Sequence, residues 1–222
     1  MTGRDGKGSL AIMMRGRFIT LEGGEGAGKS TQRAAIASAL RQVGLKVLET
    51  REPGGSPGAE EIRELIVRGD PGRWDRETEA LLVFAARRDH LQRLILPALE
   101  QGQWVVCDRF SDSTFAYQGY GRGVEVESLR ELHRFCAGDL LPDLTFLLDL
   151  PVEAGLARAA HRGGAERFEA LGLDFHERVR KGFLLLAAQE PERFVLINAS
   201  LPPEEVTQAV LKQLEQRLGL TL

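Results

Sequence analysis

The sequence predicts an α/β fold with three layers: a doubly wound, five-stranded parallel sheet flanked by helices. Short, strongly apolar runs alternate with helical patterns along the chain. The runs lack the polar and apolar alternation of a half-exposed strand, which is typical of parallel sheets covered on both faces. A glycine-rich turn also joins the first apolar run to the first helical pattern, as in ligand-binding sheets of this class.

Five apolar runs are the predicted strands, and each is rich in Val, Ile, Leu or Phe: 17–22, 46–50, 103–108, 144–150 and 193–198. Helical patterns lie between and after them at 30–43, 58–68, 75–101, 127–137, 152–161, 175–190 and 203–218. Since parallel strands joined by helices end at the same edge, we expect ligands to gather at the carboxyl ends of these strands.

The length and composition favour one globular domain. The chain has 222 residues, of which 43% are hydrophobic and 27% charged, enough for a full core. We expect residues 15–222 to form the domain and residues 1–14 to be a flexible leader. The net charge of −3 excludes a general attraction to nucleic acid or to an anionic membrane. Cys107 and Cys136 lack metal or disulfide spacing, which predicts reduced thiols and a cytoplasmic location.

The stretch "EGGEGAGKST" at 22–31 has the spacing of a phosphate-binding loop. In such loops, glycines allow backbone N–H groups to surround phosphate oxygens, the lysine reaches the terminal phosphates, and the serine hydroxyl binds Mg²⁺. The dipole of the following helix favours an anion at the same place. The residues predicted to bind ATP are Gly23, Gly24, Glu25, Gly26, Ala27, Gly28, Lys29, Ser30 and Thr31.

Charged residues that directly follow other strands indicate a second phosphorylated ligand. Arg51 and Arg109 each follow a predicted strand, and the planar arginine fork suits phosphate. Glu25 would repel phosphate from within the loop, so we expect it to face a hydroxyl group instead. A second acidic residue at a strand end could position Mg²⁺ through water; Asp108 and Asp149 both fit, and spacing alone leaves the choice open.

Seven motifs in the same order make the chain resemble the thymidylate kinase family. They are "FITLEGGEGAGKSTQ", "TREPGG", "LLVFAARRDHL", "DRFSDSTFAYQG", "GRG", "PDLTFLLDLP" and "LAAQEPERF", and they extend from about Arg17 towards the C-terminus. The resemblance implies the P-loop kinase fold with a mobile lid, phosphorylation of dTMP to dTDP by Mg·ATP for DNA precursor supply, and a homodimer. The predicted partners are nucleotides, with neither nucleic acid nor a membrane among them.

The resemblance also implies roles for single residues, beginning with the acceptor dTMP. Arg51 and Arg109 would bind its phosphate, and Glu25 would meet the 3′ hydroxyl of its sugar. The other residues expected around its base and sugar are Phe84, stacked on thymine, Arg88, donating to a base carbonyl, Ser113 and Gln118, lining the base pocket, and Tyr117, crowding the 2′ position.

The expected lid lies at about 161–174. In the family branch that lacks an arginine at the position of Gly26, the lid supplies the catalytic arginine, which here implies Arg162 and Arg167 beside Lys29 and Arg109. Arg158 would belong to the preceding helix. The chain departs from the family pattern at Glu166 and at Arg87, where aspartate is common.

Two other classes of function share parts of this pattern. Another P-loop nucleoside monophosphate or deoxynucleoside kinase would have the same loop but should lack "TREPGG" and "AYQG". A regulatory P-loop protein would bind a nucleotide without transferring phosphate; the sequence contains no Asn-Lys-x-Asp motif, and an arginine-rich lid is superfluous for binding alone.

Overall fold

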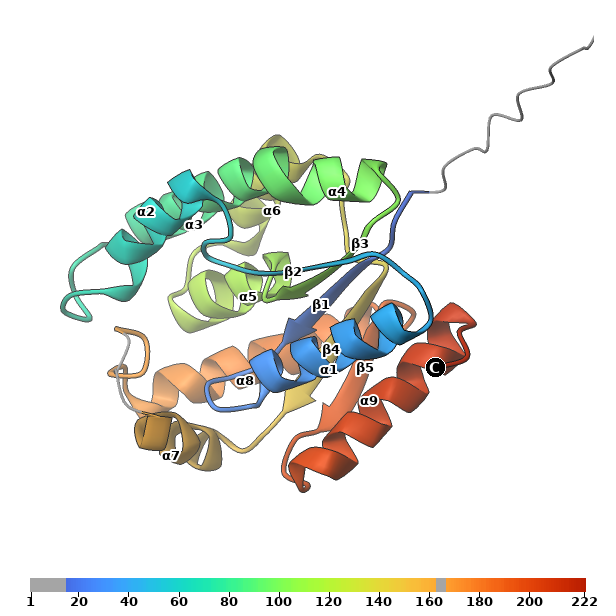
Figure 1. The fold of residues 1–222 in the computed structure, drawn as a ribbon. Helices are drawn as coiled ribbons and strands as arrows, with labels where there is room; N and C mark the ends of the chain where they lie inside the picture. The colour runs from blue at the N-terminus through green and yellow to red at the C-terminus, as the bar shows by residue number, and fades with distance from the viewer. Residues whose placement is uncertain (1–14, 163–166) are drawn as a thin grey trace, which may run out of the picture.

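The computed structural model describes residues 15–162 and 167–222, apart from the side chain of Arg162. Its strands form one parallel sheet of five in the order β2-β3-β1-β4-β5 (Figure 1). The strands are β1 (Phe18–Glu22), β2 (Val47–Arg51), β3 (Trp104–Asp108), β4 (Leu144–Asp149) and β5 (Phe194–Asn198). Each begins and ends within one residue of its predicted range, so the parallel α/β fold is confirmed.

The helices follow the predicted pattern closely, except between β3 and α6. They are α1 (Lys29–Gln42), α2 (Pro57–Val67), α3 (Arg76–His90), η1 (Leu91–Ile95), α4 (Leu96–Glu100), α5 (Ser111–Thr114), η2 (Phe115–Gly121), α6 (Val126–Ala137), α7 (Val152–Arg162), α8 (Leu173–Gln189) and α9 (Pro203–Leu218). The segments η1 and η2 are π-helical. Because α3, η1 and α4 are consecutive, the single helix predicted at 75–101 is present with a π-helical turn inside it.

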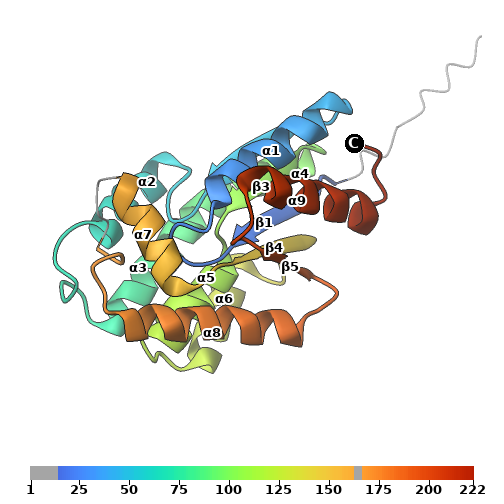
Figure 2. The ribbon, with the colours of Figure 1, turned by 90° about the horizontal axis from the view of Figure 1, so that it is seen from below.

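Helices cover both faces of the sheet. Figure 2 shows α1 and α9 on one side of the strands and α8 and α6 on the other. The first face is a core in which Ile36 of α1 and Val210 of α9 pack with Leu21 and Phe146 of the strands. On the second face, Phe18 packs with η1 and α4, and Leu147 packs with α8 and η2. Burial on both faces explains why the strand sequences are continuously apolar.

The sequence predicts no helix between the strand at 103–108 and the helix at 127–137, but residues 111–121 are helical. Its run of Gly and aromatic residues has weak intrinsic helix propensity, so tertiary packing stabilises it instead. A Cβ on Gly121 would lie 2.7 Å from the Phe175 ring, and a Cβ on Gly182 would lie 2.6 Å from the Tyr120 ring. The two glycines therefore allow η2 to lie directly against α8, and this packing fixes the side chains that η2 presents.

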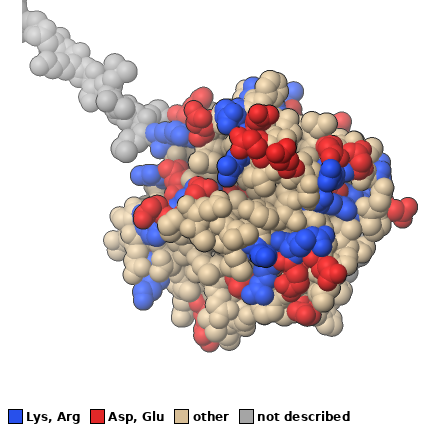
Figure 3. Space-filling view, turned by 180° about the vertical axis from the view of Figure 1, so that it is seen from behind, with Lys and Arg blue, Asp and Glu red and all other residues tan. Residues whose placement is uncertain are grey.

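The surface mixes charges of both signs. On the face drawn in Figure 3, basic and acidic side chains are interspersed and separated by uncharged surface. Such a face does not have the single-sign field of a nucleic-acid-binding surface. Within the two ranges that the structure describes, we find no helix with both the length and the apolar character to cross a membrane.

Candidate active site

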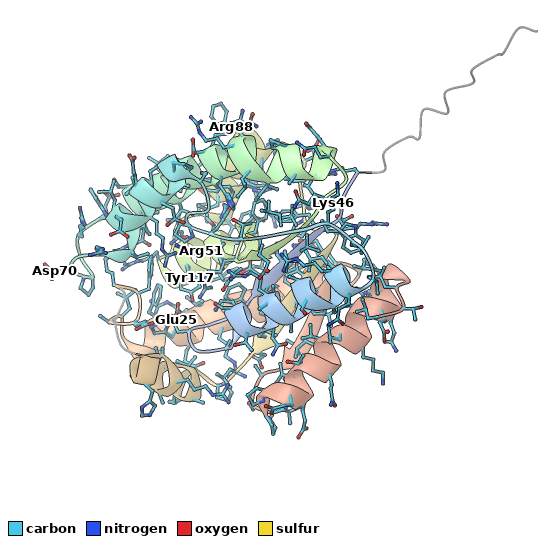
Figure 4. The ribbon with its side chains drawn as sticks, viewed as in Figure 1. Glu25, Lys46, Arg51, Asp70, Arg88 and Tyr117 are labelled. Carbon is cyan, nitrogen blue, oxygen red and sulfur yellow. The ribbon has the colours of Figure 1, made fainter. Side chains whose placement is uncertain are left out.

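A cavity of about 450 Å³ opens at the carboxyl ends of the strands. One end is formed by the P-loop and by Arg51 and Asp108, and the other by side chains of α2, α3 and η2. Figure 4 shows Glu25, Arg51 and Tyr117 turned towards this space between the upper and lower helices. We call the two parts the phosphate end and the base end. Their chemistry differs, and each depends on different elements.

The P-loop has the conformation that its glycines permit. Gly26 and Gly28 have φ of +65° and +90°, in the region that side chains disfavour. Gly28 precedes α1, whose first N–H groups have no side-chain cap. The Lys29 ammonium lies over the loop and donates to the carbonyls of Gly23 and Gly24 at 3.1 and 2.7 Å. Burial and the positive charge of Arg109 lower the pKa of Lys29 to about 8.

Helix α7 touches the P-loop backbone to backbone. A Cβ on Gly26 would lie 2.1 Å from the carbonyl oxygen of Gly155, and one on Gly155 would lie 2.4 Å from that of Glu25. No side chain fits at position 26 without moving α7. This contact places Arg158 on the cavity wall, where its Nη1 donates to the Ala199 carbonyl at 3.0 Å.

The two carboxylates at strand ends have different partners. Asp108 accepts a hydrogen bond from the Ser30 hydroxyl at 2.8 Å and lines the cavity. Asp149 instead accepts two hydrogen bonds from Arg180, at 2.8 and 2.9 Å. Asp108 therefore lies beside the serine of the loop, whereas both oxygens of Asp149 are engaged by a helix α8 side chain.

Arg109 is the centre of the phosphate end. Its φ of +71° is a left-handed conformation, which is strained for a residue with a side chain. The guanidinium donates to the Gly23 carbonyl at 2.9 Å, the Ser113 hydroxyl at 3.1 Å and Glu25 at 3.1 Å. The Tyr117 hydroxyl donates to the same Glu25 oxygen at 2.7 Å. Burial opposes a charge on Glu25, but Arg109 and Lys29 outweigh burial and lower its pKa to about 2.

A buried glutamate holds the backbone next to Arg109. Glu22 accepts hydrogen bonds from the Phe110 N–H at 2.8 Å and from the Ser113 hydroxyl at 2.5 Å. Its side chain is shielded from water, and burial together with the charge of Asp112 raises the pKa of Glu22 to about 8. Apart from its place before the P-loop glycines, no pattern in the sequence indicates this role for Glu22. Glu22 ties the end of β1 to the loop that carries Arg109.

The base end contains a buried arginine with one unused donor. Arg87 donates from Nε to Glu52 at 2.7 Å and from Nη2 to the Phe110 carbonyl and the Thr114 hydroxyl, at 3.1 and 2.8 Å. His90 contacts the other Glu52 oxygen at 3.2 Å. Within the described residues, Nη1 of Arg87 is buried without a hydrogen-bond partner, and Arg87 lines the cavity. A buried donor without a partner calls for an explanation, and an acceptor atom of a ligand in the adjoining cavity would supply one.

Phe84 and Arg88 are elsewhere on α3. Phe84 is buried among Ala80, Leu129 and Cys136. Arg88 donates to the Cys136 carbonyl of α6 at 2.9 Å, and Figure 4 shows it on the outer side of the helix. Neither residue is among the described residues that line the cavity, whereas Val83 and Arg87 both line it. Val83 and Arg87 are four residues apart, as are Phe84 and Arg88, but they lie one position earlier on α3.

Three comparisons with known proteins match this chain to one family over most of its length. The thymidylate kinase family model matches residues 21–210. The thymidylate kinase of Caulobacter vibrioides is 53% identical over 208 residues, covering 94% of this chain and 100% of the relative. That of Pseudomonas fluorescens strain SBW25 is 54% identical over 197 residues, covering 89% and 94%. The chain belongs to the thymidylate kinase family. A crystal structure of thymidylate kinase from Ehrlichia chaffeensis aligns with a TM-score of 0.74 at 35% identity, covering 90% of this chain and 99% of that one.

Family membership confirms the kinase fold and an enzyme that binds nucleotides. The two lid arginines expected to be catalytic are Arg162 and Arg167. Arg167 is 3% exposed and is not among the described residues lining the cavity. Its guanidinium donates to the Ile66 and Pro71 carbonyls at 2.8 and 3.2 Å and to Glu79 at 2.5 Å. The side chain of Arg162, and part of the lid expected at 161–174, lie outside the described residues, as does the leader expected at 1–14.

The structure brings most of the other expected residues of this thymidylate kinase family member together. The cavity is lined by Glu25, Lys29, Ser30, Arg51, Arg109, Ser113, Tyr117 and Gln118, all expected from the sequence. It is also lined by Glu52, Val83, Arg87, Arg158 and Phe168, which were not assigned to the site. For Arg87, the only signal in the sequence is its place four residues after Val83, and adjacent arginines made that signal ambiguous.

Proposed function

We propose that this cavity binds the donor and acceptor of phosphoryl transfer, with ATP at the P-loop and dTMP between Arg109 and Arg87. The enzyme phosphorylates dTMP to dTDP with ATP as donor, the activity of the family to which it belongs. The observation that carries the assignment of the acceptor is the pairing within one cavity of a cationic phosphate end with a buried, unused arginine donor at the base end.

The reaction calls for positioning and charge rather than for a general base. A nucleoside monophosphate is largely dianionic at neutral pH, because its second pKa is near about 6. The attacking oxygen therefore needs no proton removed, but two anions must be brought into line. Lys29 would hold the terminal phosphates of ATP, while Arg109, with Arg51 across the cavity, would bind the phosphate of dTMP. Arg51 is half-exposed and paired with Glu60 at 3.0 Å, so it is free to exchange that partner for a phosphate.

Magnesium fits the residues present at the phosphate end. The Ser30 hydroxyl and the Asp108 carboxylate lie within hydrogen-bonding distance of each other, and each offers an oxygen atom as a metal ligand. Among the described residues no cluster of three or more His, Cys, Asp or Glu could hold a metal. Mg²⁺ in kinases is usually bound by one or two protein oxygens together with waters and substrate phosphates. The ion would neutralise phosphate charge, and Asp108 is favoured over Asp149 for positioning it.

At the base end, Arg87 takes the role that the sequence suggested for Arg88. Nη1 of Arg87 would donate to a carbonyl of thymine, and Gln118 would meet the neighbouring atom of the base. Val83 and Phe168 supply apolar wall. Glu25 would meet the 3′ hydroxyl, and Tyr117, held against Glu25, would crowd the 2′ position. One methyl group distinguishes thymine from uracil, worth about 0.8 kcal/mol of burial, so weaker activity on dUMP is expected.

Helix α7, which contacts the P-loop where ATP would bind, carries two arginines. Arg158 lines the cavity on the helix that touches the P-loop, and Arg162 follows it by four residues on the same helix. Both would stabilise charge on the transferred phosphoryl group. Arg167 is bound to Glu79 and the end of α2, so a structural role is favoured for it over the catalytic role expected from the sequence.

The test is ADP release by the purified protein with Mg·ATP and, in separate reactions, dTMP, dUMP, dGMP, GMP, CMP or no acceptor. We expect strong turnover with dTMP, weaker turnover with dUMP and almost none with the others. Turnover with a purine monophosphate, or hydrolysis of ATP regardless of acceptor, would contradict the base-end assignment while leaving the P-loop intact.

We also propose a homodimer through α3 and α6 and a cytoplasmic location. Helices α3 and α6 are joined by the Arg88 hydrogen bond to Cys136. Leu81 on α3 is 55% exposed and Phe135 on α6 is 85% exposed, an apolar surface of the kind that a partner covers. Light scattering of the wild type and of Phe135→Glu tests this: a dimer and a monomer are expected. The free thiols of Cys107 and Cys136 suit a reducing compartment.

A further inference from the structure

Glu79 is a buried carboxylate to which three side chains donate hydrogen bonds. It lies on α3 and is fully shielded from water. Gln118 of η2 donates to it from Nε2 at 3.0 Å, Arg122 from Nη2 at 3.0 Å, and Arg167 from Nη2 at 2.5 Å. Glu79 does not itself line the cavity among the described residues, but Gln118 does.

The partner of Gln118 fixes which way its amide faces. A side-chain amide has one end that donates and one that accepts, and a carboxylate only accepts. Gln118 must therefore turn its NH₂ group towards Glu79, and its carbonyl oxygen is the group that remains for a ligand in the cavity. The two arginines balance the negative charge of Glu79 in the interior and hold its carboxylate in place. Phe168, next to Arg167, lines the same cavity.

With the amide so oriented, the base end offers a donor and an acceptor. Nη1 of Arg87 is a buried donor without a partner among the described residues, and Oε1 of Gln118 is an acceptor. The edge of thymine or uracil presents an acceptor, O4, beside a donor, N3–H. The edge of cytosine presents the reverse, a donor amino group beside an acceptor nitrogen. Arg87 and Gln118 together would favour the first edge and leave unpaired groups against the second.

We propose that Glu79 is a positioning residue for base recognition: by binding the NH₂ group of Gln118, it presents the carbonyl oxygen of that side chain to the N3–H of the acceptor base. The proposal rests on the assignment of the base end above and extends it to a residue behind the cavity wall. Loss of Glu79 would let the Gln118 amide rotate, and discrimination between the two edges would then depend on Arg87 alone.

The experiment compares dUMP and dCMP, which differ only at this edge, as inhibitors of dTMP phosphorylation. The ratio of their inhibition constants is measured for the wild type, Glu79→Gln, Gln118→Met and the double variant. Glu77→Gln is the matched control, because Glu77 lies on the same helix but is exposed and pairs with Arg76 at 2.7 Å. Thermal unfolding of each variant shows that it is folded under the assay conditions.

We expect the wild type to bind dUMP more tightly than dCMP. The preference should fall at least about fivefold in Glu79→Gln, the size of one lost hydrogen bond, and stay unchanged in Glu77→Gln. In Gln118→Met the preference should fall similarly, and adding Glu79→Gln should lower it no further. A preference that survives in Glu79→Gln, with both constants weakened equally, would show mere structural support and overturn the proposal.

Gln118→Met keeps Glu79 and its two arginines, so it tests the same contact if Glu79→Gln does not fold. An unchanged preference in that variant would also overturn the proposal. A wild type that binds dCMP as well as dUMP would instead count against the base-end assignment on which the proposal rests, and the two failures are thus distinguishable.

Discussion

The phosphate end and the base end of the cavity are built in different ways. At the phosphate end, Lys29 and Ser30 come from one continuous loop, and Arg51 and Arg109 come from the ends of neighbouring strands. At the base end, Arg87 of α3, Gln118 of η2 and Phe168 after α7 come from distant parts of the chain. Two buried carboxylates bind two of these side chains: Glu52 binds Arg87, and Glu79 binds Gln118.

Because the two ends are built differently, substitutions at each end should have different effects. Groups at the phosphate end meet charge that moves during the reaction, so their loss should chiefly lower kcat. Groups at the base end are buried partners of carboxylates, so their loss should weaken acceptor binding and also destabilise the fold. Separate measurements of kcat, KM and the free energy of unfolding test this division.

The largest effect is expected at the P-loop lysine. Lys29→Met should lower kcat by about 10³-fold, because no other group replaces an ammonium at the terminal phosphates. Lys46→Met is the matched control: Lys46 is exposed, and Figure 4 places it far from Glu25 and Arg51. Steady-state ADP release from both variants gives the comparison, and a Lys29→Met enzyme with more than a tenth of wild-type kcat would contradict the role of the loop.

A smaller effect should separate two arginines that flank the lid. Arg158→Met should lower kcat by about 10²-fold and leave the thermal midpoint nearly unchanged. Arg167→Met should instead lower the free energy of unfolding by about 3 kcal/mol, since it leaves Glu79 with one arginine fewer in a buried place. Urea unfolding and kinetics on the same preparations decide between them. If Arg167→Met lowers kcat alone and remains as stable as the wild type, Arg167 is the catalytic arginine after all.

A further effect concerns the pH dependence of stability at the phosphate end. The pKa of Glu22 is raised to about 8 in the folded protein from 4.5. Between these values the folded state keeps a proton that the unfolded state has lost, so the free energy of unfolding should fall as pH rises from about 5 to 8. Glu22→Gln should remove this fall, and urea midpoints at pH 5.5 and 8 would show it. A wild type and variant with parallel pH dependence would contradict the raised pKa.

The sequence predicted the sheet, its strands within one residue and the phosphate end, because these depend on local patterns. Glycines at fixed spacing and arginines at strand ends take their places once the strands pair. The base end could not be predicted as well. Whether Arg87 or Arg88 lines the cavity depends on the rotation of α3, and the packing of Phe84 against Leu129 and Cys136 of α6 follows from the same rotation.

Tertiary packing likewise decided what sequence patterns left open. Residues 111–121 have weak helix propensity and became helical by packing on α8. Asp149 could not be distinguished from Asp108 until Arg180 was found to bind it. Glu79 gave no signal in the sequence at all, since a glutamate in the first turn of a helix is ordinarily a solvated residue.

The assignment of Arg87 to the base end is tested by dTMP binding to two neighbouring variants, Arg87→Lys and Arg88→Lys, measured by titration calorimetry. Lysine keeps the charge opposite Glu52 but lacks the fork that reaches the cavity, so Arg87→Lys should raise the Kd for dTMP at least about tenfold. Arg88→Lys should leave the Kd within about twofold of the wild type. If Arg88→Lys weakens binding and Arg87→Lys does not, the base end has been assigned to the wrong arginine and the account fails.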